Sequence, residues 1–123
     1  MTIGDPEARQ DALDLDDMRE RLGDDEELVS DVIRLFLEDY RLRLDAIASA
    51  IEARDPERLR AAAHLLKGGA LNLSAPGVVE ATRVLEAIGG SGDLTLAGAR
   101  FAVLVSETEH LASALREIQA GRS

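Results

Sequence analysis

The stretch AAAHLLKGGALNL, residues 61–73, decides how the rest of the chain is interpreted. Its alanines and leucines recur every three or four residues, which indicates a helix with one apolar face. Two adjacent glycines interrupt that helix, although glycine costs about 1 kcal/mol relative to alanine in a helix interior. The same stretch contains His64, one of the two histidines of the chain. The question is what a helix gains by placing Gly68 and Gly69 one turn after a histidine.

Residues three, four and seven apart share a face of a helix, and this rule divides the side chains around His64 into two groups. The expected core side holds Leu59, Ala63, Leu66, Ala70 and Leu73. The other side holds Arg60, His64, Lys67, Gly68 and Leu71. A missing side chain at Gly68 leaves space above the imidazole, and a neutral imidazole is a good nucleophile near neutral pH. Because nearby cations favour a bound anion, these residues together suggest a phosphoryl acceptor.

Composition limits the classes of protein to consider. The 123 residues suffice for one domain, and a chain that is 46% hydrophobic but 2% aromatic predicts an aliphatic core. Cysteine is absent, which excludes disulfides and thiolate chemistry. A net charge of −10 argues against nucleic acid as a partner. No apolar run approaches the roughly 20 residues that span a bilayer, and the N-terminus lacks a signal-peptide pattern. We therefore expect a soluble, cytoplasmic protein with no membrane association.

The periodicity of apolar residues predicts an all-α protein. Helices are expected at about residues 13–22, from Asp24 to the RDP sequence at 54–56, and at 56–73, 76–88 and 95–119. Short connections between four amphipathic helices favour an antiparallel up-down four-helix bundle with a short extra N-terminal helix. Residues 1–12 are expected to form a flexible tail, and residues 13–120 a single domain.

Particular residues are expected to begin, end and bury these helices. Asp24 is the predicted cap of the long helix, and Asp55 and Pro56 begin the next. Ser74 is a candidate cap for the fourth helix, and GGSGD at residues 89–93 is expected to form a flexible loop. The predicted core stripe of the long helix is Leu28, Val32, Phe36, Tyr40, Leu44, Ile47 and Ile51, widened by Val29, Ile33 and Leu37. Later helices are expected to bury Val78, Thr82, Leu85, Phe101, Leu104, Thr108, Leu111, Leu115 and Ile118.

The order of residues from 62 to 86, AAHLLKGGALNLSAPGVVEATRVLE, resembles the signature of histidine phosphotransfer (HPt) domains, the phosphocarriers of two-component phosphorelays. The residues in register are Ala63, His64, Leu66, Lys67, Gly68, Asn72, Leu73, Ala75, Leu85 and Glu86. Phe36 and Asp55 also stand where the family usually has these residues. The resemblance extends over about residues 13–119, and it implies the same helical fold.

The resemblance also implies roles for individual residues. His64 would be phosphorylated on Nε2, Lys67 would help neutralise the phosphoryl oxygens, and Gly68 would leave room for the phosphoryl group and a partner loop. Glu86 corresponds to an acid that hydrogen-bonds the other imidazole nitrogen in related domains of chemotaxis kinases, which would fix the tautomer. Residues expected to contact the partner are Arg60, Leu65 and Leu71.

Two positions differ from the family pattern. Ser74 replaces a glycine, and Leu71 replaces a small residue on the His64 side of the helix. These differences affect the expected fit of a partner more than the chemistry of the histidine.

The implied partners are response-regulator receiver domains and a sensor histidine kinase, with this chain acting as a monomer. The chain would be a phosphocarrier rather than an enzyme, because it shows no ATP-binding motif. It needs no cofactor of its own, since Mg²⁺ is expected on the receiver, and His64 and His110 lack metal-ligand spacing. Two alternatives remain open. The chain could be the phosphoacceptor domain of a larger sensor or chemotaxis-type kinase, or a docking module on the same fold that is never phosphorylated.

Overall fold

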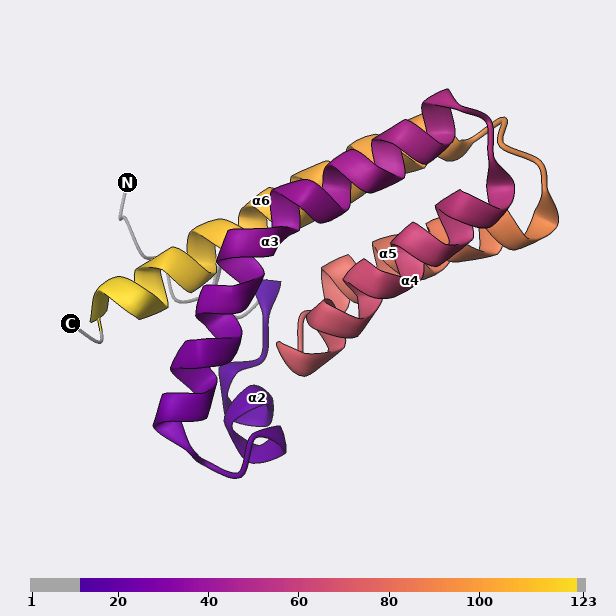
Figure 1. Ribbon diagram of the computed structural model, residues 1–123. Coiled ribbons are helices and arrows are strands. Elements are labelled where there is room, and N and C mark those ends of the chain that lie inside the picture. The colour runs from indigo at the N-terminus through magenta and orange to yellow at the C-terminus, as the bar shows by residue number, and fades with distance from the viewer. Residues whose placement is uncertain (1–11, 122–123) are drawn as a thin grey trace.

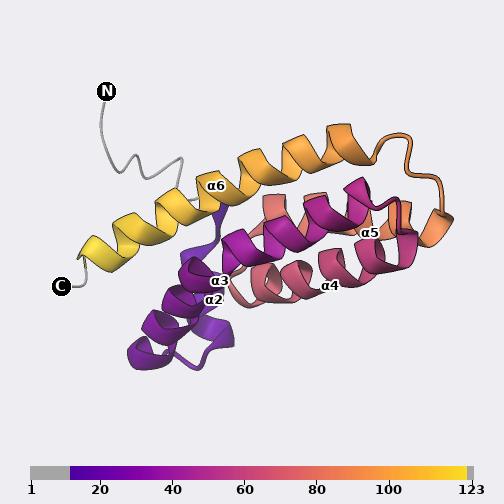
Figure 2. The same ribbon diagram turned by 45° about the horizontal axis from the view of Figure 1, so that its top comes forward.

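The computed structural model describes residues 12–121, which form helices and the turns between them, without strands. The helices are α2 (Leu15–Arg21), α3 (Glu26–Glu52), α4 (Pro56–Asn72), α5 (Pro76–Ser91) and α6 (Ala97–Gly121). Helices α3 to α6 run alternately up and down, each packs on the next, and α6 returns against α3 (Figures 1 and 2). The predicted all-α class, with four bundled helices and a short N-terminal one, is confirmed.

The short helix α2 lies at one end of the bundle. Helices α3 and α6 have 27 and 25 residues, whereas α4 and α5 have 17 and 16, so the longer pair extends past the shorter one at this end (Figure 1). The backbone N–H of Asp14 donates to the carbonyl of Ser74 over 2.8 Å, and the Ser74 hydroxyl donates to Asp17 over 2.6 Å. These bonds tie α2 to the turn between α4 and α5.

The core is mainly aliphatic, as the composition predicts, but its course along α3 differs from the predicted stripe at several positions. The buried residues of α3 are Val29, Ile33, Phe36, Tyr40, Leu44, Ile47 and Ala50. Leu28 was expected inside the bundle and is 40% exposed. Three other predicted core residues are only half-buried, namely Val32, Leu37 and Ile51. Residues 28 and 29 are both apolar, as are 32 and 33, so spacing alone does not decide which of each pair faces the core. Packing against α6 and α4 makes that choice.

The start of α3 also differs from the prediction by one residue. The N-cap is Asp25, whose Oδ1 accepts a hydrogen bond from the backbone N–H of Leu28 over 3.1 Å. Asp24 instead has a φ of 57° and belongs to the end of α2, where its N–H donates to the carbonyl of Arg19 over 2.8 Å. Two left-handed residues in succession, Gly23 and Asp24, turn the chain between the helices.

The start of α4 agrees with the sequence. Asp55 is its N-cap, with Oδ1 accepting from the N–H of Arg58 over 3.1 Å, and Pro56 occupies the first turn. Proline suits this position because its fixed φ is helical and no hydrogen bond is lost there.

Ser74 does not cap α5, contrary to the prediction. It has a φ of 53° and closes the end of α4, where its N–H donates to Leu71 and that of Ala75 donates to Ala70, both over 3.1 Å. This pairing is the Schellman arrangement, whose left-handed residue is usually glycine. The residue at the N-cap of α5 is Ala75, which makes no side-chain capping bond. The serine that replaces the expected glycine therefore takes over the conformation of glycine.

The ends of the described chain correct two further predictions. Most of the expected flexible tail, residues 1–11, lies outside the described residues, but Ala12 is 5% exposed and belongs to the core. Helix α6 begins at Ala97 rather than at Thr95, whose N–H and hydroxyl both donate to Asp93 in the preceding turn. The predicted core residues of α6 are buried, except that Phe101 is half-buried; the buried ones are Leu104, Thr108, Leu111, Leu115 and Ile118.

Helix α5 continues through the predicted loop. It ends at Ser91 instead of Ile88, and Gly89 lies buried inside it. A Cβ atom on Gly89 would come within 2.7 Å of both the Arg60 backbone nitrogen and the Pro56 carbonyl oxygen. Backbone atoms cannot move aside as a flexible side chain can, so a residue without a side chain is required there. Gly89 thus allows α4 and α5 to approach closely, one turn of α4 before His64.

Replacing Gly89 with alanine is expected to destabilise the protein by about 1–3 kcal/mol, because the new methyl group forces the two helix backbones apart. Gly90→Ala is the matched control, since a Cβ there meets nothing within 4 Å, and it should be neutral or stabilising by up to about 1 kcal/mol. Urea unfolding of both variants measures the difference. Equal stability of the two variants would show that the helices do not depend on this contact.

Candidate functional site

A hydrogen-bonded group of three side chains joins α4 to α5. His64 and Lys67 lie three residues apart on α4, and Glu86 faces them from α5. The Nδ1 atom of His64 lies 2.7 Å from Oε2 of Glu86, and Nζ of Lys67 lies 2.5 Å from its Oε1. One carboxylate therefore contacts both the imidazole and the ammonium group.

The three side chains differ in their access to solvent. The His64 side chain is 63% exposed, whereas those of Lys67 and Glu86 are 22% and 19% exposed. Glu86 precedes Gly89 by three residues, so it lies one turn from the point where the two helix backbones come closest. The close approach therefore brings the Glu86 carboxylate to the base of an imidazole that remains open to a partner.

The charge of Glu86 decides which nitrogen of His64 carries a proton. The hydrogen bond from Lys67 lowers the pKa of the Glu86 carboxyl group, and the bond to His64 adds to this effect against the opposing effect of burial. An ionised carboxylate has only acceptor atoms. Nδ1 of neutral His64 must therefore be the donor, which leaves the lone pair on Nε2. The arrangement presents Nε2 as a nucleophile on an exposed side chain.

The two glycines after His64 have different surroundings. A Cβ on Gly68 would meet no atom within 4 Å, whereas one on Gly69 would lie 3.7 Å from Cδ1 of the Phe36 ring. Gly69 belongs to the side of α4 that packs on α3, and Gly68 borders open space one turn after His64. Packing within the domain does not require a glycine at position 68. Its absence of a side chain leaves the surface beside His64 free for a partner.

The other cation near the histidine is also paired. Arg60 binds Glu57 through two nitrogens, with Nε at 3.2 Å from the carboxylate. Because Lys67 is paired with Glu86, both cations that the sequence places near His64 are already neutralised by carboxylates of the same chain. Two predicted contact residues, Leu65 and Leu71, are 57% and 41% exposed.

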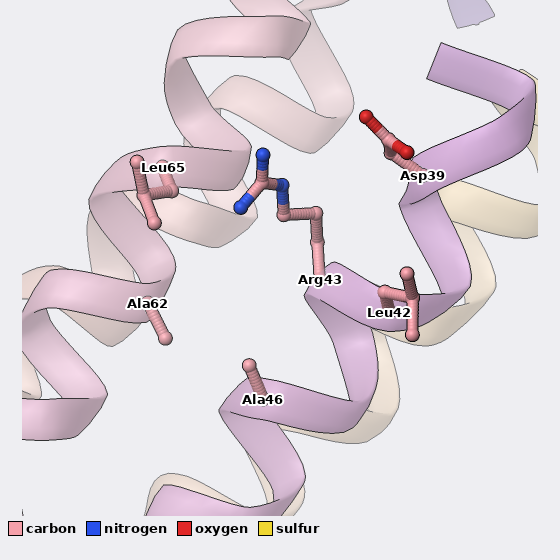
Figure 3. Close-up of a pocket in the computed structure, with 6 residues that line it drawn as sticks. All are labelled: Asp39, Leu42, Arg43, Ala46, Ala62 and Leu65. Atoms are coloured by element: carbon pink, nitrogen blue, oxygen red, sulfur yellow. The ribbon is translucent and has the colours of Figure 1, made fainter. Parts of the chain in front are cut away.

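A groove between α3 and α4 adds residues that the sequence analysis did not single out. It has a volume of about 200 Å³ and is lined by Asp39, Leu42, Arg43, Ala46, Ala62 and Leu65 (Figure 3). In Figure 3, Arg43 reaches from α3 into the space between the helices, opposite Leu65 on α4. The sequence analysis followed only the core stripe of α3. The available signal was a second set of leucines, Leu35 and Leu42, spaced seven residues apart.

Two other kinds of site are not found in the part of the chain that the structure describes. Within residues 12–121, no three His, Cys, Asp or Glu side chains are grouped so that they could hold a metal ion. No helix in the same range is long and apolar enough to cross a bilayer.

The fold and the site together define a helical bundle that presents a histidine on its surface. The family model of the Hpt domain matches residues 31–121, and the chain belongs to this family. The fold is similar to that in the crystal structure of histidine-containing phosphotransfer protein B (HptB) from Pseudomonas aeruginosa PAO1, with a TM-score of 0.83 and 24% sequence identity. This similarity covers 89% of this chain and 95% of that one. A comparison with curated proteins finds no significant match.

Removal of the Glu86 carboxylate is expected to change the tautomer of His64. In the original protein the proton of the neutral ring lies on Nδ1, and Glu86→Ala should shift it towards Nε2 because the acceptor is lost. Two-bond ¹H–¹⁵N NMR correlations of the imidazole, recorded above the pH at which the ring is protonated, report the position of the proton. Glu80→Ala, which removes a carboxylate paired with Arg83 on the same helix, is the control. Identical imidazole spectra for Glu86→Ala and the original protein would refute the assigned tautomer.

Proposed function

We propose that this chain is a phosphocarrier, in which His64 accepts a phosphoryl group from the aspartyl phosphate of one receiver domain and passes it to the aspartate of another. The Hpt domain family consists of histidine phosphotransfer modules of phosphorelays. The observation that carries the assignment to His64 is the 2.7 Å contact of its Nδ1 with Glu86. That contact leaves the Nε2 lone pair on an exposed ring.

The proposed transfer is an in-line displacement at phosphorus. The lone pair of Nε2 forms the N–P bond while the P–O bond to the receiver aspartate breaks, and the electron pair of that bond returns to the aspartate carboxylate. The ring becomes positively charged, because Nδ1 keeps its proton, and that N–H continues to donate to the Glu86 carboxylate. A second receiver aspartate reverses these changes: its carboxylate oxygen forms the new P–O bond and the N–P bond breaks. Such reactions depend on positioning and charge stabilisation more than on covalent help from the protein.

Lys67 and Gly68 are given supporting roles in this proposal. Lys67 follows His64 by three residues, and its Nζ already lies beside the same carboxylate as the ring. Rotation of its flexible side chain brings the ammonium group to the phosphoryl oxygens. Gly68 leaves room for the phosphoryl group, since the space beside it is open. The Mg²⁺ ion of the reaction belongs to the receiver, and this chain provides no cofactor.

The partner surface in this proposal surrounds His64 on α4. Arg60 lies one turn before the histidine, and Leu65 and Leu71 provide exposed apolar area. Arg60 is available for an acidic group of the receiver if it exchanges its exposed ion pair with Glu57, and exposed ion pairs of this kind are weak. A sensor histidine kinase feeds the first receiver of the relay.

The phosphorylated residue is tested with receivers that carry radiolabelled phosphate. The original protein should become labelled by its cognate receiver, with label that is stable in base and labile in acid, and His64→Gln should acquire none. His110→Gln is the control and should be labelled normally. Label that persists in His64→Gln would refute the assignment. A labelled receiver that never transfers to the original protein would instead favour a docking module.

The role of Lys67 is tested by the rate of the same transfer. Lys67→Ala should reduce the rate by about ten-fold or more, because a cation that stabilises transition-state charge is lost. The control is Arg83→Ala, which removes a cation of α5 that pairs with Glu80. Circular dichroism confirms that both variants keep their helices. Equal rates for Lys67→Ala and the original protein would exclude Lys67 from the chemistry.

A further inference from the structure

Helix α3 carries a second apolar seam in addition to its core face. Positions spaced alternately four and three residues apart form the a/d seam of a coiled coil. On α3 this seam, called the outer seam below, consists of Leu28, Val32, Leu35, Asp39, Leu42, Ala46, Ser49 and Ala53. None of its residues is among those that α3 buries in the core. A helix with two such faces has an apolar surface that its own bundle covers only in part.

Most of the outer seam is open to solvent, although Val32 is half-buried against the core and Ser49 accepts a hydrogen bond from Arg58 over 3.3 Å. Leu35 and Leu42 are 50% and 69% exposed, and Leu28 is 40% exposed. Its middle part, Asp39, Leu42 and Ala46, lines the groove between α3 and α4 together with Ala62 and Leu65 (Figure 3). A second hollow continues along the groove past Val32 and Leu35. The seam and the groove together form an elongated apolar surface on which another helix can bind.

The sizes of the seam residues indicate which helix fits. The first three seam residues, Leu28, Val32 and Leu35, are large, whereas the last three, Ala46, Ser49 and Ala53, are small. If a second α3 lies antiparallel, residues of the two copies meet in pairs: Leu28–Ala53, Val32–Ser49, Leu35–Ala46 and Asp39–Leu42. Leu28, Val32 and Leu35 of one copy then each meet a small residue of the other copy. Alternation of large and small residues in this way fills a helix interface without voids. A parallel arrangement would place leucine on leucine and Asp39 directly on Asp39.

The charges of the seam are self-complementary in the same alignment. Asp39 and Arg43 both line the groove, and neither side chain makes a hydrogen bond or an ion pair with another residue of the range 12–121. In this alignment Asp39 lies opposite Leu42 of the other copy. Arg43 of that other copy follows its Leu42 directly and therefore lies beside Asp39. A two-fold axis creates this contact twice. The antiparallel alignment therefore pairs two charges that have no partner within one copy.

We propose that α3 binds α3 of a second copy of this chain, antiparallel and about a two-fold axis, along the outer seam. The net charge of −10 makes two copies repel each other at low ionic strength, and salt screens this repulsion. The dimer thus forms at physiological ionic strength and at raised protein concentration. Leu65 follows His64 directly and lines the same groove. If the proposed function holds, the dimer competes with a receiver domain for this surface. Self-association then lowers the concentration of monomer that can accept a phosphoryl group.

Sedimentation equilibrium tests the dimer without any phosphoryl chemistry. At about 0.15 M salt, the mass should rise from 13.2 kDa towards twice that value as concentration increases. Arg43→Glu should raise the dissociation constant at least about ten-fold, because it places like charges together twice. Asp39→Arg should do the same, and the exchanged pair Asp39→Arg with Arg43→Asp should restore association. Arg34→Glu changes the net charge equally outside the seam, where Arg34 pairs with Asp31 and Glu38, and should leave the mass unchanged.

Disulfide cross-linking tests the antiparallel alignment, and the absence of native cysteine makes it unambiguous. Leu35→Cys combined with Ala46→Cys should form disulfides between copies under mild oxidation. Leu35→Cys alone should not, because the two cysteines then lie about 16 Å apart along the seam, at about 1.5 Å per helical residue.

Three results would overturn the proposal. These are a monomer mass up to about 1 mM protein, efficient cross-linking by Leu35→Cys alone, or a loss of receiver binding in Arg43→Glu with no change of mass. The last result would assign the groove to the receiver and leave the proposed function intact.

Discussion

The contact between the backbones of α4 and α5 at Gly89 is the constraint on which the site depends. A Cβ at this position would lie 2.7 Å from backbone atoms of α4, so only glycine permits this spacing of the helices. The spacing in turn brings Glu86 within hydrogen-bond distance of His64 and Lys67. The chemistry of the exposed imidazole therefore rests on a buried glycine that has no chemistry of its own.

The charged groups of the site are already paired with one another in the absence of a partner. The Glu86 carboxylate is shared between an ammonium group and an imidazole, and Lys67 is the larger cause of its lowered pKa. Sharing matters because a carboxylate buried beside a neutral ring alone would be costly. It also leaves the ammonium close to the position where the proposed phosphoryl group develops charge. The same three groups thus account for the resting tautomer and for the proposed stabilisation of transfer.

Helix α3 explains both an error in the predicted core and the proposed dimer. Its apolar residues follow two faces, one buried in the bundle and one exposed beside α4. A search for one stripe merges these faces where they are adjacent, and this placed Leu28 inside the bundle. The exposed leucines are not scattered singly, since they share a seven-residue spacing. Exposed apolar residues that are grouped mark interaction sites more often than residues scattered singly.

The sequence by itself determined whatever depends on neighbours within one helix. The approximate positions of the helices, the start of α4 at Asp55 and Pro56, and the common face of His64 and Lys67 all follow from local spacing and capping. Tertiary structure decided the rest. It extended α5 through Gly89 and turned Ser74 into the left-handed conformation beneath α2. The resemblance to HPt domains pointed to Glu86, but only the packing of α4 on α5 brought its carboxylate to the ring. These outcomes depend on residues distant in sequence, and periodicity within one helix carries no information about how closely two helices pack.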